Sequence, residues 1–326
     1  MARSPRTQQL TKWASVVVLL IATGYFVAAV SEHIDSIPPI RWGLGAWVAL
    51  FASVLCMLAN LILGGLMWKR LLGDQGVHLN ATASCQVVLM SQLAKYLPGN
   101  VGHLVGQVAL ASKFGVPAGV SFATMLISML WLAAIGLLVG AAGLVIYLDK
   151  ASGIHIPLPD EPVLAVLAVL FACVPWIGVW FLNRFIPKLS QWLGNGRLIE
   201  LPRFLTALLL AAGFLTSFLI FGVMIKVQAV YMFGVHDGNV LNFSLLFATA
   251  WVAGYLLPGA PGGLGVREAL SVTLLSVLVG TGTAIGLSIT MRLATVLGDG
   301  LAFLVGLSIR TLTADHLSHR HPPPTN

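Results

Sequence analysis

The 326-residue sequence is poor in charge and in cysteine, and it lacks motifs for catalysis or nucleotide binding. Charged residues make up 9% and hydrophobic residues 58% of the chain, whereas soluble domains carry about 25% charged residues. This scarcity of charge excludes an ordinary soluble domain and indicates an integral membrane protein. The formal net charge of +7 then favours basic cytoplasmic loops over nucleic-acid binding.

The sequence also lacks the motifs of metal sites, nucleotide sites and common hydrolases, which reduces the number of possible functions. Cys56, Cys85 and Cys173 lie far apart in apolar segments, so they predict neither a metal site nor a disulfide framework. The chain has no Walker A loop, no H-E-x-x-H and no G-x-S-x-G with partners. The Gly-rich stretch at 259–265 follows no strand of a βαβ unit, which argues against a dinucleotide site. We therefore expect no enzyme activity and no cofactor, and ATP-driven transport would need a separate subunit.

Long apolar runs predict an all-α polytopic membrane protein with about six full transmembrane helices, because one span needs about 20 apolar residues. The predicted spans cover residues 13–30, 43–67, 118–148, 163–182, 203–232 and 284–309. The length of the first run favours a retained span over a cleaved signal peptide. We expect one transmembrane domain over 1–310. The His- and Pro-rich segment 311–326 is expected to be a disordered cytoplasmic tail rather than a metal site.

Basic residues predict the orientation of these spans. With the N-terminus in the cytoplasm, the outside segments hold only Arg41 and Lys150. The inside segments then hold Arg3, Arg6, Lys12, Lys69, Arg70, Lys113, Arg184, Lys188, Arg197, Arg203, Arg310 and Arg320. This asymmetry has the sign that the positive-inside rule demands. Both termini are therefore expected in the cytoplasm.

Two further apolar regions, about 82–113 and 243–280, are each broken near the middle by Pro-Gly. The pieces before the breaks, 82–97 and 243–257, have about 15 residues, which is short of a full crossing at 1.5 Å per residue. Charge alone leaves open whether each region crosses twice. Length favours two re-entrant hairpins, each entering and leaving on one face.

The two broken regions resemble each other, which predicts an internal repeat. An ungapped alignment of 98–110 with 258–270 matches Pro98, Gly99, Gly102, Leu104, Ala109 and Leu110 to Pro258, Gly259, Gly262, Leu264, Ala269 and Leu270. Each half has the order span, span, broken region, span. Because three full spans per half is an odd number, the halves, about 1–160 and 161–310, are expected to be inverted relative to each other. Inverted repeats with broken helices are common in membrane transporters.

The breaks predict a site for an anion. Proline ends the first arm and glycine allows close approach of backbone or ligand. The predicted tip residues are Pro98, Gly99, Gly102, Pro258, Gly259, Gly262, Gly263 and Gly265. The helix after each tip presents unpaired N–H groups, which attract anions. Lys95 precedes one tip and Arg267 follows the other, so an anionic group such as a lipid phosphate is expected between them.

Charged and polar residues inside the apolar regions supply the candidate substrate-binding residues, because charges at membrane depth usually face a cavity or a partner. The candidates are Lys95, Asn100, His103, Gln107, Arg267, Glu268, Arg292 and Asp299. Arg292 and Asp299 lie two turns apart, too far for a direct pair, so each is expected to meet another segment. Structural alternatives stay open: an Arg267–Glu268 ion pair fixing the hairpin, a packing role or proton relay for His103, and a snorkelling Lys226.

The segments "AKYLPGNVGHLVGQVALASKFGVP" and "LPGAPGGLGVREAL" resemble the two signature segments of the lysylphosphatidylglycerol synthase membrane-region family, also described as flippase-like. The resemblance covers roughly 10–310. It implies a multi-spanning bacterial or archaeal inner-membrane protein linked to moving lipids or lipid-linked sugars. Bifunctional members carry a soluble aminoacyl-transfer domain that is not expected here, so lysyl transfer is not carried over. Many relatives have a basic residue where this chain has Gln107, which weakens the expected cationic site on the first hairpin.

Three functions fit these observations. The paired broken helices and their cationic residues favour flippase- or scramblase-like translocation of an anionic lipid or lipid-linked glycan. The second function is a non-transporting membrane partner of a lipid-modifying or glycosyltransferase enzyme. The third is transport of a small anion, coupled to protons through Glu268, Asp299 or His103.

Overall fold

The structure is a computed structural model that describes residues 38–40, 42–96, 102–152, 161–256 and 266–318. These residues form helices and the turns between them, without a β-strand, which confirms the all-α prediction. Four helical segments are long and apolar enough to cross a membrane: Leu44–Asp74, Ala118–Gly143, Phe204–Phe233 and Thr281–Thr311. The protein is therefore embedded in a membrane. The predicted first span at 13–30 and the end of the predicted tail lie outside the described residues.

The long helices follow the predicted apolar runs but extend past them. They are α2 (Leu44–Asp74), α5 (Ala118–Ser152), α6 (Glu161–Phe185), α8 (Phe204–Phe233) and α11 (Thr281–Ser318), with a short α7 (Pro187–Leu193). The predicted span 163–182 lies inside α6. Helix α2 continues seven residues beyond the predicted span 43–67, because a contact with a distant part of the chain stabilises its end. The buried carboxylate of Asp74 accepts a hydrogen bond from the Arg203 backbone N at 3.0 Å, which secures the end of α2.

Each Pro-Gly region folds back on itself as a helical hairpin. The first hairpin comprises α3 (Ala81–Ser91), a 3₁₀ turn η2 (Gln92–Tyr96) and α4 (Gly102–Ser112), and the second comprises α9 (Val240–Leu256) and α10 (Val266–Val279). Glycine allows the arms of each hairpin to touch. A Cβ added to Gly106 would lie 3.1 Å from the Ala94 Cβ, and one added to Gly254 would lie 3.1 Å from the Arg267 Cβ.

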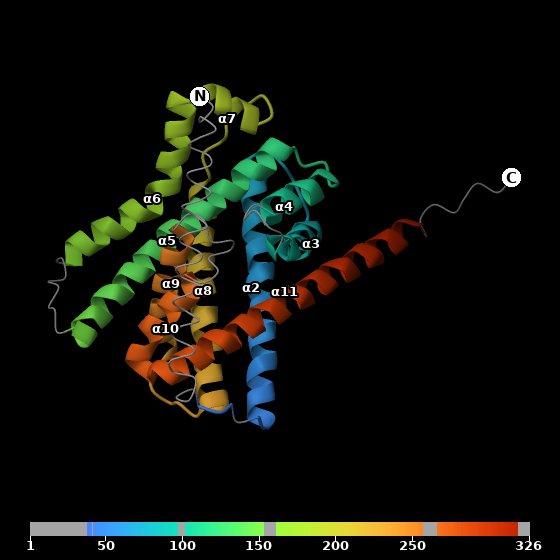
Figure 1. The fold of residues 1–326 in the computed structure, drawn as a ribbon. Coiled ribbons are helices and arrows are strands. Elements are labelled where there is room, and N and C mark those ends of the chain that lie inside the picture. The colour runs from blue at the N-terminus through green and yellow to red at the C-terminus, as the bar shows by residue number, and fades with distance from the viewer. Residues whose placement is uncertain (1–37, 41, 97–101, 153–160, 257–265, 319–326) are drawn as a thin grey trace, which may run out of the picture.

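The two hairpins start and end at opposite ends of the bundle (Figure 1). Helices α2 and α8 are antiparallel, because Arg203 bonds Asp74 at one end while Gly45 packs on Tyr231 at the other. The first hairpin joins the Asp74 end of α2 to the start of α5, where the Trp68 Nε1 donates to the Thr124 Oγ1 at 3.0 Å. The second hairpin follows the far end of α8 and returns to the start of α11.

Each hairpin packs against the last long helix of the other half of the chain. Helix α9 lies on α5, where the Thr249 Oγ1 donates to the Gly140 carbonyl at 2.9 Å. Helix α3 lies on α11, where Gly306 faces Met90. Small residues let such helices approach closely, as is common in membrane proteins. Each half thus packs its hairpin on a long helix of the other half, which is the pattern expected of two structurally related halves.

The resemblance of the hairpins continues into their first turns, beyond the aligned tips. The Asn80 Oδ1 accepts a hydrogen bond from the backbone N three residues on, and Asn239 makes the same contact before α9. Side-chain oxygens at these positions satisfy unpaired N–H groups at a helix start. Ser84 then donates to the Gly65 carbonyl of α2 at 2.7 Å. Its counterpart at +160, Ser244, packs against Gly222 of α8.

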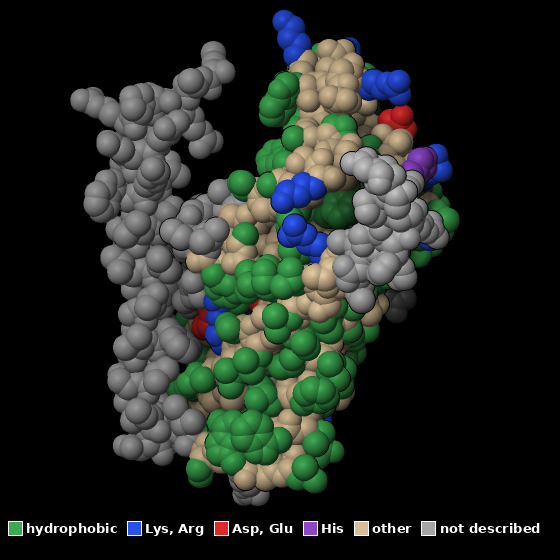
Figure 2. Space-filling model, turned by 90° about the vertical axis from the view of Figure 1, so that its right-hand side faces the viewer, with side chains coloured by type: hydrophobic (Ala, Val, Ile, Leu, Met, Phe, Trp, Pro, Cys, Tyr) green, Lys and Arg blue, Asp and Glu red, His purple; other side chains and the backbone are tan. Residues whose placement is uncertain are grey.

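Charge is concentrated at one end of the bundle. Figure 2 shows Lys and Arg side chains gathered there, beside a surface of mainly hydrophobic side chains. The exposed basic residues in or next to the α2–α3, α4–α5 and α6–α8 connections are Arg70, Lys113, Arg184, Lys188, Arg197 and Arg203. All six belong to the set predicted to face the cytoplasm. Lys226 lies towards the other end of α8, is partly exposed, and donates to the His236 carbonyl at 2.6 Å.

Candidate functional site

The buried part of α11 brings the two hairpins into one charged site. Arg292 and Asp299 lie seven residues apart, so they project from one face of the helix about two turns apart. Neither pairs with the other. Asp299 meets the first hairpin and Arg292 meets the second. This confirms that each of these residues pairs with another segment.

The first hairpin is joined to α11 through Lys95 and Tyr96. The Lys95 Nζ lies 2.6 Å from the Asp299 Oδ2, and the Tyr96 hydroxyl donates to the same oxygen at 2.6 Å. The Asp299 side chain is fully buried at 0% exposure, whereas Lys95 retains 28%. Buried carboxylates need a partner, because an isolated charge in a medium of low polarity is costly. This pair therefore fixes the end of the first arm against α11.

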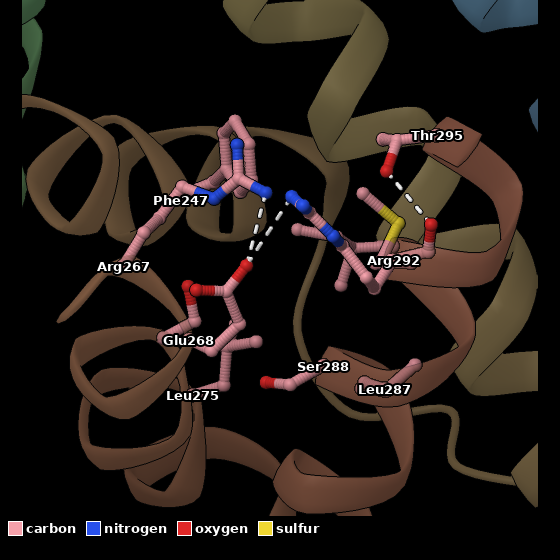
Figure 3. A pocket seen from close by; sticks show the side chains of 11 residues that line it. Phe247, Arg267, Glu268, Leu275, Leu287, Ser288, Arg292 and Thr295 are labelled. Carbon is pink, nitrogen blue, oxygen red and sulfur yellow. Dashed lines mark hydrogen bonds and ion pairs between the residues drawn. The ribbon is translucent and has the colours of Figure 1, made fainter. Parts of the chain in front are cut away.

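The second hairpin contributes an adjacent cation and anion, and α11 adds a second cation. The Arg267 Nη2 lies 3.2 Å from the Glu268 Oε1, and the Arg292 Nη1 lies 3.6 Å from the same oxygen. Figure 3 shows both guanidinium groups reaching this single oxygen, the Arg267 side chain from the left of the view and the Arg292 side chain from the right. The expected Arg267–Glu268 ion pair is present, and Arg292 turns it into a cluster of three.

The two charged groups interact electrostatically, since Lys95 lies within reach of both Arg267 and Arg292. Together they contain three cations and two carboxylates, Glu268 and Asp299, which leaves a surplus of one positive charge. A positive surplus in a partly buried site attracts an anion more strongly than it would on an exposed surface, because water screens it less. The residues flanking both predicted tips therefore meet as one cationic site.

A small pocket opens beside the second hairpin. Its charged and hydroxyl-bearing lining consists of Arg267, Glu268, Ser271, Ser288, Arg292 and Thr295. Apolar side chains such as Phe247, Leu275 and Leu287 complete the wall (Figure 3). The pocket thus combines an apolar wall with a few convergent polar groups, as small-molecule sites do. In the part of the chain that the structure describes, no group of three or more His, Cys, Asp or Glu side chains is placed to hold a metal ion.

The remaining predicted residues divide into two groups. His103 lies in the first turns of α4 within electrostatic reach of Lys95, and Gln107 is buried farther along the same helix. Gly102 is the first residue of α4. The other predicted positions fall outside the described residues: Asn100, Pro98, Gly99, Pro258, Gly259, Gly262, Gly263 and Gly265.

Sequence reasoning missed Tyr96 and the pocket hydroxyls. Tyr96 follows Lys95 directly, but only the tertiary structure shows its hydroxyl on Asp299. Ser271 and Ser288 carried a signal, because each lies four residues from an arginine, Arg267 or Arg292, and so shares its helix face. Serine is common in membrane helices, so this spacing alone does not single out a site.

A family model matches residues 12–302, nearly the whole chain. The chain belongs to the lysylphosphatidylglycerol synthase TM region family. It is therefore a membrane protein related to lipid modification or transport. The matched range includes both hairpins and the α11 residues Arg292 and Asp299, so the whole charged site lies within it. A search of curated proteins found no match.

Proposed function

We propose that this member of the lysylphosphatidylglycerol synthase TM region family moves an anionic lipid or lipid-linked glycan across the inner membrane, in the manner of a flippase or scramblase. The observation that carries the proposal is the meeting of both hairpins with α11 in one site with surplus positive charge. In this proposal the protein catalyses no covalent chemistry. The site recognises the anionic head group and the hairpins provide its path.

The arrangement of the hairpins supports movement rather than static binding. Their ends lie at opposite ends of the bundle, as two re-entrant segments entering from opposite faces would. Antiparallel α2 and α8 agree with an inverted repeat. In transporters with inverted repeats, substrate sites lie where the two repeats meet near the midplane. The basic end, which includes Arg70 and Arg184, would face the cytoplasm under the positive-inside rule.

A lipid substrate is supported by the position of the site near the bundle surface. The Lys95 and Arg292 side chains keep 28% and 29% exposure, so a head group can reach them without opening the core. The neighbouring outer faces of α11 expose Ile289, Leu293 and Val296. Acyl chains would lie against such a surface while the head group occupies the charged site.

The test is lipid translocation in proteoliposomes of the purified full chain, with fluorescent anionic and zwitterionic lipids. We expect faster movement of the anionic lipid, and loss of that acceleration in Arg267→Ala. Lys226→Gln, which removes a partly exposed cation outside the site, is the matched control and should move lipid as the wild type does. Unchanged movement in Arg267→Ala would count against this site.

Two other outcomes identify the alternative functions. If folded wild-type protein moves no lipid but takes up a small anion with a dependence on pH, ion-coupled anion transport replaces the proposal. If it moves neither, a non-transporting role beside a lipid-modifying or glycosyltransferase enzyme replaces it, and co-purification of such an enzyme is the next measurement.

A further inference from the structure

The pocket at the second hairpin contains one carboxylate oxygen shared by two arginines. The Glu268 Oε1 accepts a hydrogen bond from the Arg267 Nη2 at 3.2 Å and forms an ion pair with the Arg292 Nη1 at 3.6 Å. Figure 3 shows one nitrogen of each guanidinium group turned towards this oxygen. Paired guanidinium groups match the geometry of oxyanions, phosphate above all. The carboxylate oxygen therefore stands where an oxygen of a bound anion would be held.

Ser288 supplies a second, independent sign of a ligand. Its side chain is buried, with 6% exposure, and its Oγ has no hydrogen-bond partner among the residues that the structure describes. A buried hydroxyl without a partner costs free energy. Ser288 lies one turn before Arg292 on α11, so both face the same pocket (Figure 3). An oxygen of an anion held by the arginines would satisfy this hydroxyl.

The pocket is also open enough for exchange. The side-chain exposures of Arg267, Glu268 and Arg292 are 18%, 11% and 29%. Two cations against one carboxylate leave a local surplus of one positive charge. Because charge-assisted hydrogen bonds are strong in a pocket shielded from water, Glu268 and an external anion would compete for the same two donors.

We propose that Arg267, Arg292 and Ser288 form a binding site for a phosphate-type oxyanion, and that Glu268 occupies this site until the anion displaces it. The identification of the anion with a lipid head group rests on the proposed function, whereas the site itself rests on the pocket geometry. Glu268 thus sets the affinity: it keeps the arginines paired when no substrate is present and weakens binding by competition.

The test is calorimetric titration of the purified full chain in non-ionic detergent, with inorganic phosphate and with short-chain phosphatidic acid as separate probes. Glu268→Gln removes the competing charge and should tighten binding about tenfold, as expected for charge-assisted contacts. Arg292→Gln should weaken binding by a similar factor of about ten. Ser288→Ala, which removes one neutral hydrogen bond, should weaken it about fivefold. Lys226→Gln should bind as the wild type does.

Each outcome decides the proposal. This pattern with both probes supports recognition of the phosphate group itself, and the pattern with the lipid probe alone supports a head-group site that also needs the acyl or ester portion. Weaker or unchanged binding in Glu268→Gln, or wild-type affinity in Arg292→Gln, overturns it. If Glu268→Gln does not fold, wild-type affinity in Ser288→Ala, which removes a single oxygen, overturns it instead. Anion binding with no lipid movement would overturn the translocation proposal and leave this site standing.

Discussion

The two hairpins share a skeleton but differ in charge. Both begin with an asparagine that bonds the backbone of the first turn, and in both a serine then packs on a glycine of the preceding long helix. In the aligned arms after the tips, however, Gln107 occupies the position of Arg267, and Val108 occupies that of Glu268. The first hairpin contributes its only charge to the site earlier, at Lys95.

The long helices on which the hairpins rest differ in the same way. Helix α5 supports the second hairpin and has no charged residue between Ala118 and Gly143, whereas α11 supports the first and carries Arg292 and Asp299. The repeated contacts depend on small residues and close packing, which both halves keep. The charged residues serve the proposed binding site, and a single site requires only one group of charged residues. The packing residues are therefore repeated in both halves, whereas the charges of the proposed site occur on only one of the two supporting helices.

The largest effect is expected from breaking the link of the first hairpin to α11. Lys95→Met leaves Asp299 charged and fully buried, and removing one partner of a buried pair costs about 3 kcal/mol or more of unfolding free energy. Asp299→Asn should cost less, because Lys95 reaches solvent. The double variant should recover most of the loss. Denaturant unfolding in detergent measures this cycle, and equal losses in the two single variants would contradict it.

The shared skeleton predicts matched losses at the two glycines beneath the hairpins. A Cβ at Gly65 would lie 2.8 Å from the Cys85 Cα, and one at Gly222 would lie 2.5 Å from the Val240 carbonyl oxygen. Overpacking against backbone costs about 2 kcal/mol, so both alanine variants should unfold more easily by this amount. Gly64→Ala is the control, because no atom lies within 4 Å of its added Cβ. If alanine is tolerated at only one of the two positions, the two hairpins do not pack on their long helices in the same way.

The difference in charge predicts that the hairpins are not interchangeable. Arg267→Gln should weaken binding of inorganic phosphate about tenfold, by loss of a charge-assisted contact. Gln107→Arg added to this variant should not restore affinity, because position 107 is buried on α4 and does not line the pocket. Calorimetry on the single and double variants measures this, and recovery in the double variant would show that the two positions serve one site.

The smallest effect is expected at Lys226, outside both hairpins. Its side chain is partly exposed and its Nζ contacts the His236 carbonyl, and surface substitutions of this kind change stability by about 0.5 kcal/mol. Lys226→Gln should therefore match the wild type in unfolding and in lipid movement. A large loss in either measurement would extend the functional region beyond the site on α11.

Sequence patterns predicted the all-helical fold, the two broken regions and the charged residues of the candidate site. The lengths of the apolar runs predicted where the long helices lie. The Pro-Gly pairs predicted where the two broken regions lie. The scarcity of charge singled out Lys95, Arg267, Glu268, Arg292 and Asp299, because each such residue in an apolar region needs a reason. The partner of each charge could not be predicted, since it depends on how helices distant in the chain pack. The same holds for Tyr96 and Ser288, whose residue types are unremarkable until their neighbours are known.

By itself, the sequence determined that this is a membrane protein with two related broken regions and a few costly charges, because length, hydrophobicity and spacing are local properties. Only the tertiary structure decided that α11 receives both hairpins, that Asp299 pairs with Lys95, and that Glu268 is shared by two arginines. These pairings follow from close helix packing through small residues, which brings together side chains up to 204 positions apart, from Lys95 to Asp299.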